Sequence, residues 1–423
     1  MKLSRIGRVS MALVASVAMG LGMTACGGGT IGFMWVLGTQ YNQIAGFKID
    51  DFSGNLTQIP HSPFSSGGSD PVSLVVKPGG RFLYVVNKGG SNNTGVNPAC
   101  GTNGSISEFS VGGQGVLTFQ QCFQAQGQTP VWAAHDSTGN FLYVLSQTAP
   151  PPSPTVDDPN PPAPANGAIT VFAADPNTGR LTLVLNQQIK DPNTGLQLTY
   201  FPVGNQPSML AIAGGCVFTL NRADNTVFPY AAGASGQLTQ TTNSLITTGA
   251  TNATSIITGG TSIYITDAGT PNSPGQILPF TVAATSCALN TITGGATANI
   301  SPASNPVYAL VGGTGSSNTH LYVANQSTTN STLPNSSISA FNIQTNGQLQ
   351  PLPDPGNNPY PVGGGPVCMV EDPSNQYIYT SNGDGTVTGK SISTVGQLSN
   401  LKRATTFTAT GQATCLAVSG NVD

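Results

Sequence analysis

A short apolar run recurs along the chain next to glycine or other turn residues. The version that begins at Phe82 reads "FLYVVN" and follows shortly after two glycines. Its relatives read "FLYVLS" from Phe141, "CVFTLN" from Cys216, "SIYITD" from Ser262, "HLYVAN" from His320 and "YIYTSN" from Tyr377. A repeated run of this kind is typical of one supersecondary unit copied along a chain. The sequence therefore predicts a repeat protein.

Each copy of the unit contains four short apolar segments. A segment that opens with proline, such as "PVSLVV", comes before the "FLYVVN" run. An alternating segment such as "SISEFSV" follows, and a Gly turn leads to a last short segment such as "VLTF". Glycine-flanked runs with a period of two are typical of antiparallel strands. Each unit is therefore predicted to be a four-stranded antiparallel sheet.

The two ends of the chain carry complementary fragments of this unit. Residues 32–59 supply the second, third and fourth strands, and residues 411–419 supply a first strand with nothing after it. Joined together, they make one complete sheet and bring the total to seven. Radial repetition of four-stranded sheets protects strand edges in β-propellers. We therefore predict an all-β, seven-bladed propeller that its C-terminal strand closes. The alternative, a β-solenoid, gives no reason for complementary ends.

The order of the strands predicts which turns share a face of the propeller. Turns after the second and fourth strands of every blade lie on one face, and the other turns lie on the opposite face. The long connections fall after second strands in blades two, three and six, and after fourth strands at residues 186–206 and 353–365. Long insertions on one face usually mark the binding face of a repeat protein. We call this the long-loop face and the other the tight-turn face.

Polar residues follow the second strands where the chain reaches the long-loop face. We take these as candidate ligand-facing residues: Asn87, Lys88, Asn221, Arg222, Asp267, Asn325, Asn382 and Asp384. Asn at the end of a strand also commonly bonds to nearby backbone, so a purely structural role is the alternative. The function predicted from this pattern is binding of a small molecule, a sugar derivative or a protein, or a scaffold role, through the long-loop face.

The four-part unit resembles the repeats of the YVTN and lactonase-type seven-bladed propellers, which include the propeller-type 6-phosphogluconolactonases. The resemblance rests on the Pro-led strand, the Tyr-Val-x-Asn strand and the two Gly-led strands, and it extends over residues 32–419. It implies the propeller fold, and it implies lactone hydrolysis as an alternative function. A fold by itself hosts many functions.

The residues for that chemistry are not evident in the sequence. The lactonase-type family often carries His directly after the Pro that opens the first strand. The corresponding residues are Val72, Val131, Ser208, Val307 and Val367. The chain contains three histidines, His61, His135 and His320, for which we expect structural or surface roles. Glu371 takes the blade-seven position equivalent to His135. No catalytic residue is assigned.

The N-terminus is typical of an exported protein. A basic head, "MKLSRIGR", comes before an apolar stretch that is too short to span a membrane as a mature helix. It ends in "MTAC", which resembles a bacterial lipobox with Cys26 as the lipidated residue. We predict a signal peptide at residues 1–25, a tether at 26–31 and one propeller domain at 32–423. The alternative is an ordinary signal peptide cleaved near Ala25.

The resemblance to bacterial lipoproteins implies a cell-envelope protein anchored by lipid. No Asp follows Cys26, and the next residues are three glycines, which favours the periplasmic side of the outer membrane. The remaining six cysteines suit an oxidising compartment. The blade positions favour the pairs Cys100 with Cys122, Cys216 with Cys287, and Cys368 with Cys415. Six free thiols are the alternative.

Charged residues make up only 7% of the chain, against about 25% in ordinary soluble domains. Removal of the first 25 residues takes three of the 13 basic side chains and none of the 16 acidic ones, which leaves a formal net charge of −6. No basic run is present, so nucleic-acid binding is not expected. The sequence shows no cluster of metal ligands. We predict no metal site and no cofactor, and we expect a monomer.

Overall fold

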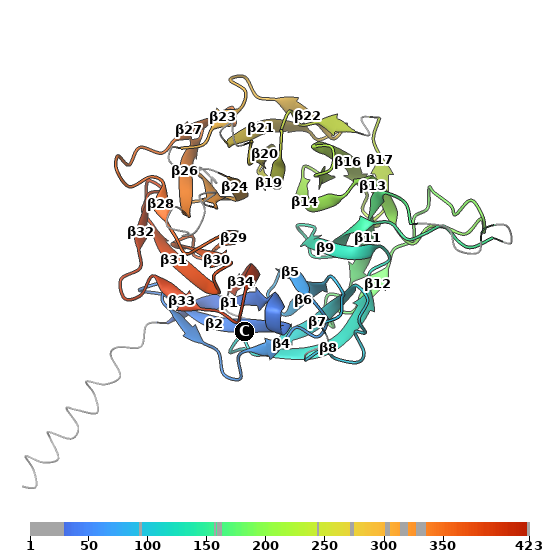
Figure 1. Ribbon diagram of the computed structural model, residues 1–423, viewed down its shortest axis with the longest axis horizontal. Helices are drawn as coiled ribbons and strands as arrows, with labels where there is room; N and C mark the ends of the chain where they lie inside the picture. Colours follow the sequence, from blue (N-terminus) through green and yellow to red (C-terminus); the bar gives the residue numbers. More distant parts are fainter. Residues whose placement is uncertain are drawn as a thin grey trace, which may run out of the picture.

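Seven antiparallel sheets surround a central axis in the computed structural model of the chain (Figure 1). The structure describes residues 29–92, 95–155, 158, 163–242, 245–270, 275–300, 305–313, 320–326 and 336–420. The predicted seven-bladed β-propeller is confirmed. The described residues include one short 3-10 helix, η1 (Thr39–Tyr41), and no helix long and apolar enough to cross a membrane.

The first strand of each blade lies nearest the axis, and the second strand follows outward. From blade one to blade seven, the first strands are β34 (Ala413–Gly420), β5 (Pro71–Val76), β9 (Gln128–His135), β14 (Pro207–Ala213), β19 (Ala253–Gly259), β24 (Pro306–Gly312) and β29 (Pro366–Glu371). The second strands are β1 (Thr30–Gly38), β6 (Phe82–Asn87), β10 (Phe141–Thr148), β15 (Cys216–Asn221), β20 (Ser262–Asp267), β25 (His320–Asn325) and β30 (Tyr377–Asn382).

The third and fourth strands form the outer part of each blade. The third strands are β2 (Gln43–Asp50), β7 (Ser105–Val111), β11 (Asn166–Ala174), β16 (Thr226–Ala232), β21 (Gln276–Ala283), β26 (Ser337–Ile343) and β31 (Thr386–Ile392). The fourth strands are β3 (Leu56–Gln58), β8 (Leu117–Gln124), β12 (Leu181–Leu183), β17 (Leu238–Gln240), β22 (Ala288–Thr291), β27 (Leu349–Pro351) and β32 (Leu398–Asn400).

Six blades carry a fifth, short strand that the sequence did not suggest. These strands pair with the other half of the third strand: β4 (Phe64–Ser65), β13 (Phe201–Asn205), β18 (Ile246–Thr247), β23 (Thr297–Ala298), β28 (Tyr360–Pro361) and β33 (Thr406–Thr408). In blade two, β8 runs along the whole of β7 from Leu117 to Gln124, with one irregularity in its pairing. Five of these strands have two or three residues and β13 has five, which is too short to show a clear hydrophobic period, and this is why the pattern missed them.

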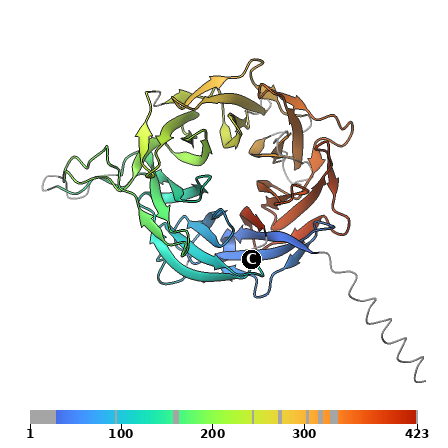
Figure 2. The same ribbon diagram turned by 180° about the vertical axis from the view of Figure 1, so that it is seen from behind.

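The C-terminal strand closes the ring as the chain ends predicted. β34 pairs antiparallel with β1, with Val418 opposite Met34, and gives blade one the sheet order β3-β2-β1-β34. The first and last described segments therefore lie side by side (Figures 1 and 2). Because the closing contact is a strand pairing, blade one receives the same backbone hydrogen bonds as the other blades.

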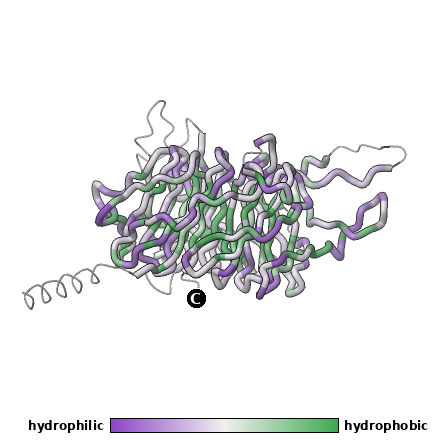
Figure 3. Tube along the Cα trace, turned by 90° about the horizontal axis from the view of Figure 1, so that it is seen from below, coloured by the Kyte–Doolittle hydropathy of each residue, from purple (hydrophilic) through white to green (hydrophobic). Residues whose placement is uncertain are grey.

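Second strands are buried on both faces because each blade is stacked between two others. All six residues of β6 are buried, and so are all six of β15, β20, β25 and β30. Strands covered on both faces read as continuous apolar runs instead of alternating ones. This explains the "FLYVVN" pattern. In the side view the apolar segments concentrate inside the disc (Figure 3).

One hydrogen bond joins neighbouring blades at repeated positions. The aromatic residue in the middle of a second strand donates to the carbonyl of a glycine in the turn between the third and fourth strands of the next blade. Tyr264 Oη lies 3.1 Å from Gly347 O, and Tyr322 Oη lies 2.9 Å from Gly396 O. The further pairs are Trp35 with Gly115, Tyr84 with Gly179, and Tyr379 with Gly54.

The accepting residue has to be glycine for two reasons. Gly347 and Gly396 have φ values of 83° and 82°, in the left-handed region that glycine adopts without strain. A Cβ at Gly396 would lie 2.5 Å from the His320 ring of the preceding blade. His320 therefore packs against this turn, as its expected structural role requires.

Two of the seven junctions depart from this pattern. Between blades four and five, Phe218 has no hydroxyl, and Cys287 takes the left-handed turn position with φ 53°. Here the Cys216–Cys287 disulfide joins the two blades, with 5.7 Å between its Cα atoms. Between blades three and four, the Tyr143 hydroxyl has no hydrogen-bond partner among the described residues, although Phe141 still packs on Gly236 and the two blades share a hydrophobic cluster.

The structure contains all three disulfides at the pairings that the blade positions favoured. Cys100–Cys122 lies within blade two, and Cys368–Cys415 joins the first strand of blade seven to the closing strand β34. The Cα atoms of each of these pairs are 5.1 Å apart, within the range of ordinary disulfides. Two of the three bonds thus connect different blades.

The inter-blade hydrogen bond can be tested with a pair of tyrosines. Tyr322→Phe leaves the buried Gly396 carbonyl without a donor, so we expect the free energy of unfolding to fall by about 1–3 kcal/mol. Tyr143→Phe is the matched control and should change it by less than about 0.5 kcal/mol. Urea denaturation measures both. Equal effects of the two substitutions would contradict the role assigned to the bond.

Candidate functional site

Five of the eight candidate residues at the second-strand exits are buried inside the blades. Asn87, Asn221, Asp267, Asn325 and Asn382 each have an exposed fraction of 0%. They do not face solvent, and the structural alternative describes their contacts. Sequence position placed them correctly at the strand ends but could not show that the connection to each blade's first strand passes over several of them.

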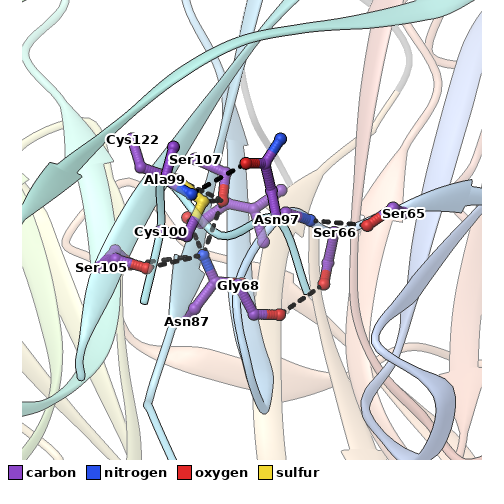
Figure 4. Close-up of a disulfide and its surroundings, with 12 residues drawn as sticks. Ser65, Ser66, Gly68, Asn87, Asn97, Ala99, Cys100, Ser105, Ser107 and Cys122 are labelled. Atoms are coloured by element: carbon purple, nitrogen blue, oxygen red, sulfur yellow. Dashed lines mark hydrogen bonds between the residues drawn. A yellow bond between two sulfur atoms is a disulfide. The ribbon is translucent and has the colours of Figure 1, made fainter. Parts of the chain in front are cut away.

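The buried asparagines bond to the third strand of their own blade. Asn87 Nδ2 donates to Ser107 Oγ at 2.8 Å, as Figure 4 shows. Asn325 Nδ2 makes the equivalent bond to Ser339 Oγ, and Asn382 Nδ2 to Thr388 Oγ1, both at 3.0 Å.

Glycines of the incoming linker lie directly on three of these amides. A Cβ at Gly68 would lie 2.5 Å from Asn87 Cγ, and Gly204 and Gly363 lie as close to Asn221 and Asn382. This close approach buries the amide side chains beneath the linker. The close approach also explains why a glycine stands three residues before the first-strand proline in each of these blades.

Asp267 holds the corresponding turn in blade five through its carboxylate. It accepts hydrogen bonds from the amides of Thr251 at 3.0 Å, Asn252 at 2.8 Å and Gly269 at 3.0 Å, and from Gln276 Nε2 at 3.0 Å. Burial opposes ionisation, but these donors outweigh it and lower the pKa of Asp267. The carboxylate is already surrounded by protein donors.

The three exposed candidates differ from one another. Asp384 accepts from the amides of Thr386 at 3.0 Å and Gly364 at 2.6 Å, so it shapes its own turn. Arg222 is exposed on blade four. Lys88 is exposed as well and stands at the wall of a cleft between blades two and three. Of the eight candidates, Lys88 is therefore the one that a described cavity contains.

We call this cavity the Lys88 cleft. It has a volume of about 510 Å³ and lies where the long loop of blade two, the linker to blade three and the start of the blade-three loop meet. Side chains and backbone that line it include Lys88, Thr102, Asn103, Gln124, Gln126, Gln128, Thr129 and Pro150. Loops after second and fourth strands thus share this face, as the strand order predicted.

The Cys100–Cys122 disulfide fixes one wall of the Lys88 cleft. Cys100 lies in the loop just before Thr102 and Asn103, and Cys122 lies on β8 just before Gln124. Gln124 Nε2 donates to the Cys100 carbonyl at 3.5 Å. The loop is also anchored at Asn97, whose amide donates to Gly67 O at 2.7 Å. The wall is therefore tied covalently to the rigid sheet (Figure 4).

The chemistry available in the cleft is hydrogen bonding and one positive charge. Its lining contains amide and hydroxyl side chains and the Lys88 ammonium, and no His, Asp or Glu among the described residues that line it. General acid–base catalysis needs such a titratable group within reach of the reacting atoms. The described residues also contain no group of three His, Cys, Asp or Glu side chains arranged to hold a metal ion.

Part of the chain is similar to a known family of propellers. Residues 30–150, which extend from β1 of blade one to β10 of blade three, match the profile described as "Lactonase, 7-bladed beta-propeller". The resemblance to the lactonase-type propellers is confirmed. No curated protein matches the chain.

Solved structures of the same architecture extend over almost the whole chain. The periplasmic gluconolactonase of Pseudomonas aeruginosa is 15% identical, with a TM-score of 0.65 over 93% of this chain and 100% of that one. A protein from Bacteroides fragilis described as a "putative 6-phosphogluconolactonase" is 16% identical, with a TM-score of 0.63 over 92% of this chain and 98% of that one. At such low identity the likeness shows the fold.

His135 and Glu371, which take equivalent positions in blades three and seven, lie apart in the structure. His135 ends the first strand of blade three, and its ring lies 5.3 Å from the ring of Tyr84 in blade two. Glu371 ends the first strand of blade seven and accepts from the Gly313 amide of blade six at 2.9 Å. Each side chain packs against the preceding blade, so the two do not form a pair.

Burial shifts the pKa values of these two groups in opposite senses. Desolvation raises the pKa of Glu371 from 4.5 to about 7, with the Gly313 amide opposing and Asp372 adding to the shift. Desolvation lowers the pKa of His135 from 6.5 to about 4, with the Phe141 carbonyl opposing and Lys77 adding to it. Both groups are therefore mostly neutral in the folded protein in mildly acidic solution.

These shifts predict two opposing slopes of stability with pH. The folded protein holds the Glu371 proton more tightly than the unfolded chain, so this contribution is lost as pH rises from 4.5 to 7. The unfolded chain holds the His135 proton more tightly, so that contribution is lost as pH falls from 6.5 to 4. Each amounts to about 3 kcal/mol, and the two largely cancel.

Substitution of one group should expose the slope of the other. Relative to the unsubstituted protein, Glu371→Gln should gain about 3 kcal/mol of unfolding free energy between pH 4.5 and 7, and His135→Gln should lose a similar amount between pH 4 and 6.5. Urea denaturation at a series of pH values measures both differences. A pH-independent difference for either variant would show that its pKa is not shifted.

Proposed function

We propose that the protein is a binding module that holds a small polyhydroxylated acid, of the sugar-acid class, in the Lys88 cleft on its long-loop face. The observation that carries the proposal is the composition of the cleft. Amide and hydroxyl groups surround a single cation, and no His, Asp or Glu stands among the lining residues. Such a site can recognise a ligand, but the ammonium of Lys88 has no lone pair with which to take a proton from water.

The ligand class follows from the hydrogen-bonding capacity of the lining. Amide side chains such as Gln124 and Gln126 donate and accept, which suits neighbouring hydroxyls of a sugar. The Gln126 backbone is held in place because its amide donates to Thr170 Oγ1 at 3.0 Å. The Lys88 ammonium adds a donor for a carboxylate. Because the rest of the lining is uncharged, the single positive charge of Lys88 matches a ligand with one negative charge.

Binding of D-gluconate tests the proposal. Lys88→Ala should weaken gluconate at least about tenfold, because a charged hydrogen bond of roughly 1.5–3 kcal/mol is lost. Gln126→Ala should weaken it as well. Arg222→Ala is the matched control, since it removes an exposed cation from the equivalent position of blade four and should leave affinity unchanged. Isothermal titration calorimetry measures all four proteins, and equal losses in Lys88→Ala and Arg222→Ala would contradict the site.

Lactone hydrolysis is the second candidate function, and the family match favours it. The Pseudomonas aeruginosa protein of the same architecture is named a periplasmic gluconolactonase. The titration series therefore includes glucono-δ-lactone, with the rate of ring opening followed against the spontaneous background. We expect binding without acceleration. Acceleration that Lys88→Ala or His135→Gln abolishes would replace the binding function with this one.

The proposed location is the bacterial envelope, through lipid on Cys26, which lies outside the described residues. β1 begins at Thr30, so a lipid on Cys26 would hold the propeller close to the membrane. In a bacterial host we expect the natural chain to sediment with membranes and Cys26→Ser to be absent from that fraction. A chain that is soluble in the periplasm whatever residue stands at 26 would support the ordinary signal peptide instead.

A further inference from the structure

A second cavity lies on the propeller axis, away from the Lys88 cleft. It has a volume of about 280 Å³ and is lined mainly by apolar residues of the first strands. The residues that the argument uses are Leu74, Ala134, Ile212, Ile257 and Leu416. His135 and Ile212 also line the groove between blades three and four, among the turns of the tight-turn face. We call this cavity the axial funnel, and it adjoins the face opposite the long loops.

Two aromatic rings from opposite sides of the ring form the inner end of the funnel. Trp132 belongs to β9 of blade three and Tyr308 to β24 of blade six, which face each other across the axis (Figure 1). Their ring centroids are 6.3 Å apart with an angle of 44° between the planes. Aromatic pairs at this separation attract one another. The Trp132 and Tyr308 side chains therefore meet on the axis, in the space between the first strands of the blades.

A shared backbone irregularity accounts for the position of these rings. In all seven blades the pairing of the first strand shifts near the start of the strand, directly after Pro130 in β9 and directly after the opening residue in the other six. Such a bulge re-aims the side chains that follow it. Four residues that come directly after this shift line the funnel: Trp132, Met209, Tyr308 and Cys415. The last belongs to the disulfide with Cys368, so this layer is also covalently fixed.

The funnel wall is mainly apolar and carries four polar side-chain groups. These are the Tyr308 hydroxyl, the Trp132 ring nitrogen, the Thr258 hydroxyl and the ring of His135, whose Nε2 has no hydrogen-bond partner among the described residues. Sugars would lose several hydrogen bonds to water on entering such a space, and an ion would lose its hydration. Apolar cavities instead remain dry and accept apolar rings, and a cavity of about 150 Å³ already holds benzene.

We propose that the axial funnel is a binding site for a small, uncharged molecule with one or two apolar rings, which stacks on Trp132 and Tyr308. A single polar substituent on the ring would reach the Tyr308 hydroxyl. Most small-molecule sites share this composition of apolar walls, aromatic residues and a few directed polar groups. The inference does not depend on the Lys88 cleft, because the two sites differ in face, polarity and residues.

Tryptophan fluorescence gives a direct readout because the chain has only two tryptophans. Trp35 is fully buried and donates to Gly115 O at 3.1 Å, whereas Trp132 is half-buried at the end of the funnel. Nitrobenzene is a neutral single-ring probe that quenches tryptophan on contact. We expect saturable quenching of Trp132 with a dissociation constant of roughly 1 mM or lower, given the nine non-hydrogen atoms of the probe.

Three variants locate the probe. Trp132→Phe should remove the saturable quenching, which assigns the signal. Ala134→Phe fills the funnel and should abolish binding, whereas Ala234→Phe narrows the neighbouring groove between blades three and four and should leave binding unchanged. Quenching that rises linearly with probe concentration, equally in the unsubstituted protein and Ala134→Phe, would overturn the site. If Ala234→Phe alone lost binding, the probe would bind in the groove between blades three and four, and this result would also overturn the axial funnel as the site.

Competition in the unsubstituted protein keeps the proposal testable if Ala134→Phe fails to fold. Cyclohexanol, an uncharged apolar ring with one hydroxyl, should displace nitrobenzene and restore the fluorescence. D-Glucose, of similar size but covered with hydroxyls, should not. Displacement by glucose and not by cyclohexanol would contradict the polarity assigned to the funnel.

Discussion

The contact between each second strand and the next blade's outer turn governs the architecture. An aromatic donor from one blade reaches the carbonyl of a left-handed glycine in the next, and a side chain two residues earlier packs against that glycine. A buried donor and acceptor must find each other, because leaving either unpaired costs about 1–3 kcal/mol. The hydrogen bond therefore fixes how neighbouring blades are aligned with each other, as well as the distance between them.

The departures from this rule are as informative as the rule. Where Phe218 cannot donate, the Cys216–Cys287 disulfide joins the same two elements, with Cys287 in the backbone conformation that glycine holds elsewhere. Where the ring closes, Cys368–Cys415 links blade seven to β34. Between blades three and four neither the hydrogen bond nor a disulfide is present among the described residues, and a groove of about 560 Å³ opens there.

The two faces of the disc differ in chemistry because different turns reach them. Long polar loops between blades two and three enclose the Lys88 cleft, and the Cys100–Cys122 disulfide holds one of its walls. The axis near the tight-turn face is apolar, since inward residues of the first strands are mostly Val, Ile, Leu and aromatic. The propeller thus carries a polar cleft on its long-loop face and an apolar cavity near its tight-turn face, and His135 and Glu371 are each packed against a preceding blade instead of meeting.

Local sequence determined the number of blades, the ring closure, the strand order and the three disulfide pairs. These follow from short-range periodicity, glycine positions and the complementary chain ends, all of which are properties of a linear pattern. It also placed Asn87, Asn221, Asp267, Asn325 and Asn382 at strand exits. Only the tertiary structure decided that these side chains are buried, because their partners, including the glycine linkers that cover Asn87, Asn221 and Asn382, come from other parts of the blade. The contact between Trp132 and Tyr308 likewise could not be predicted from the sequence, because it joins blades that face each other only when the ring closes.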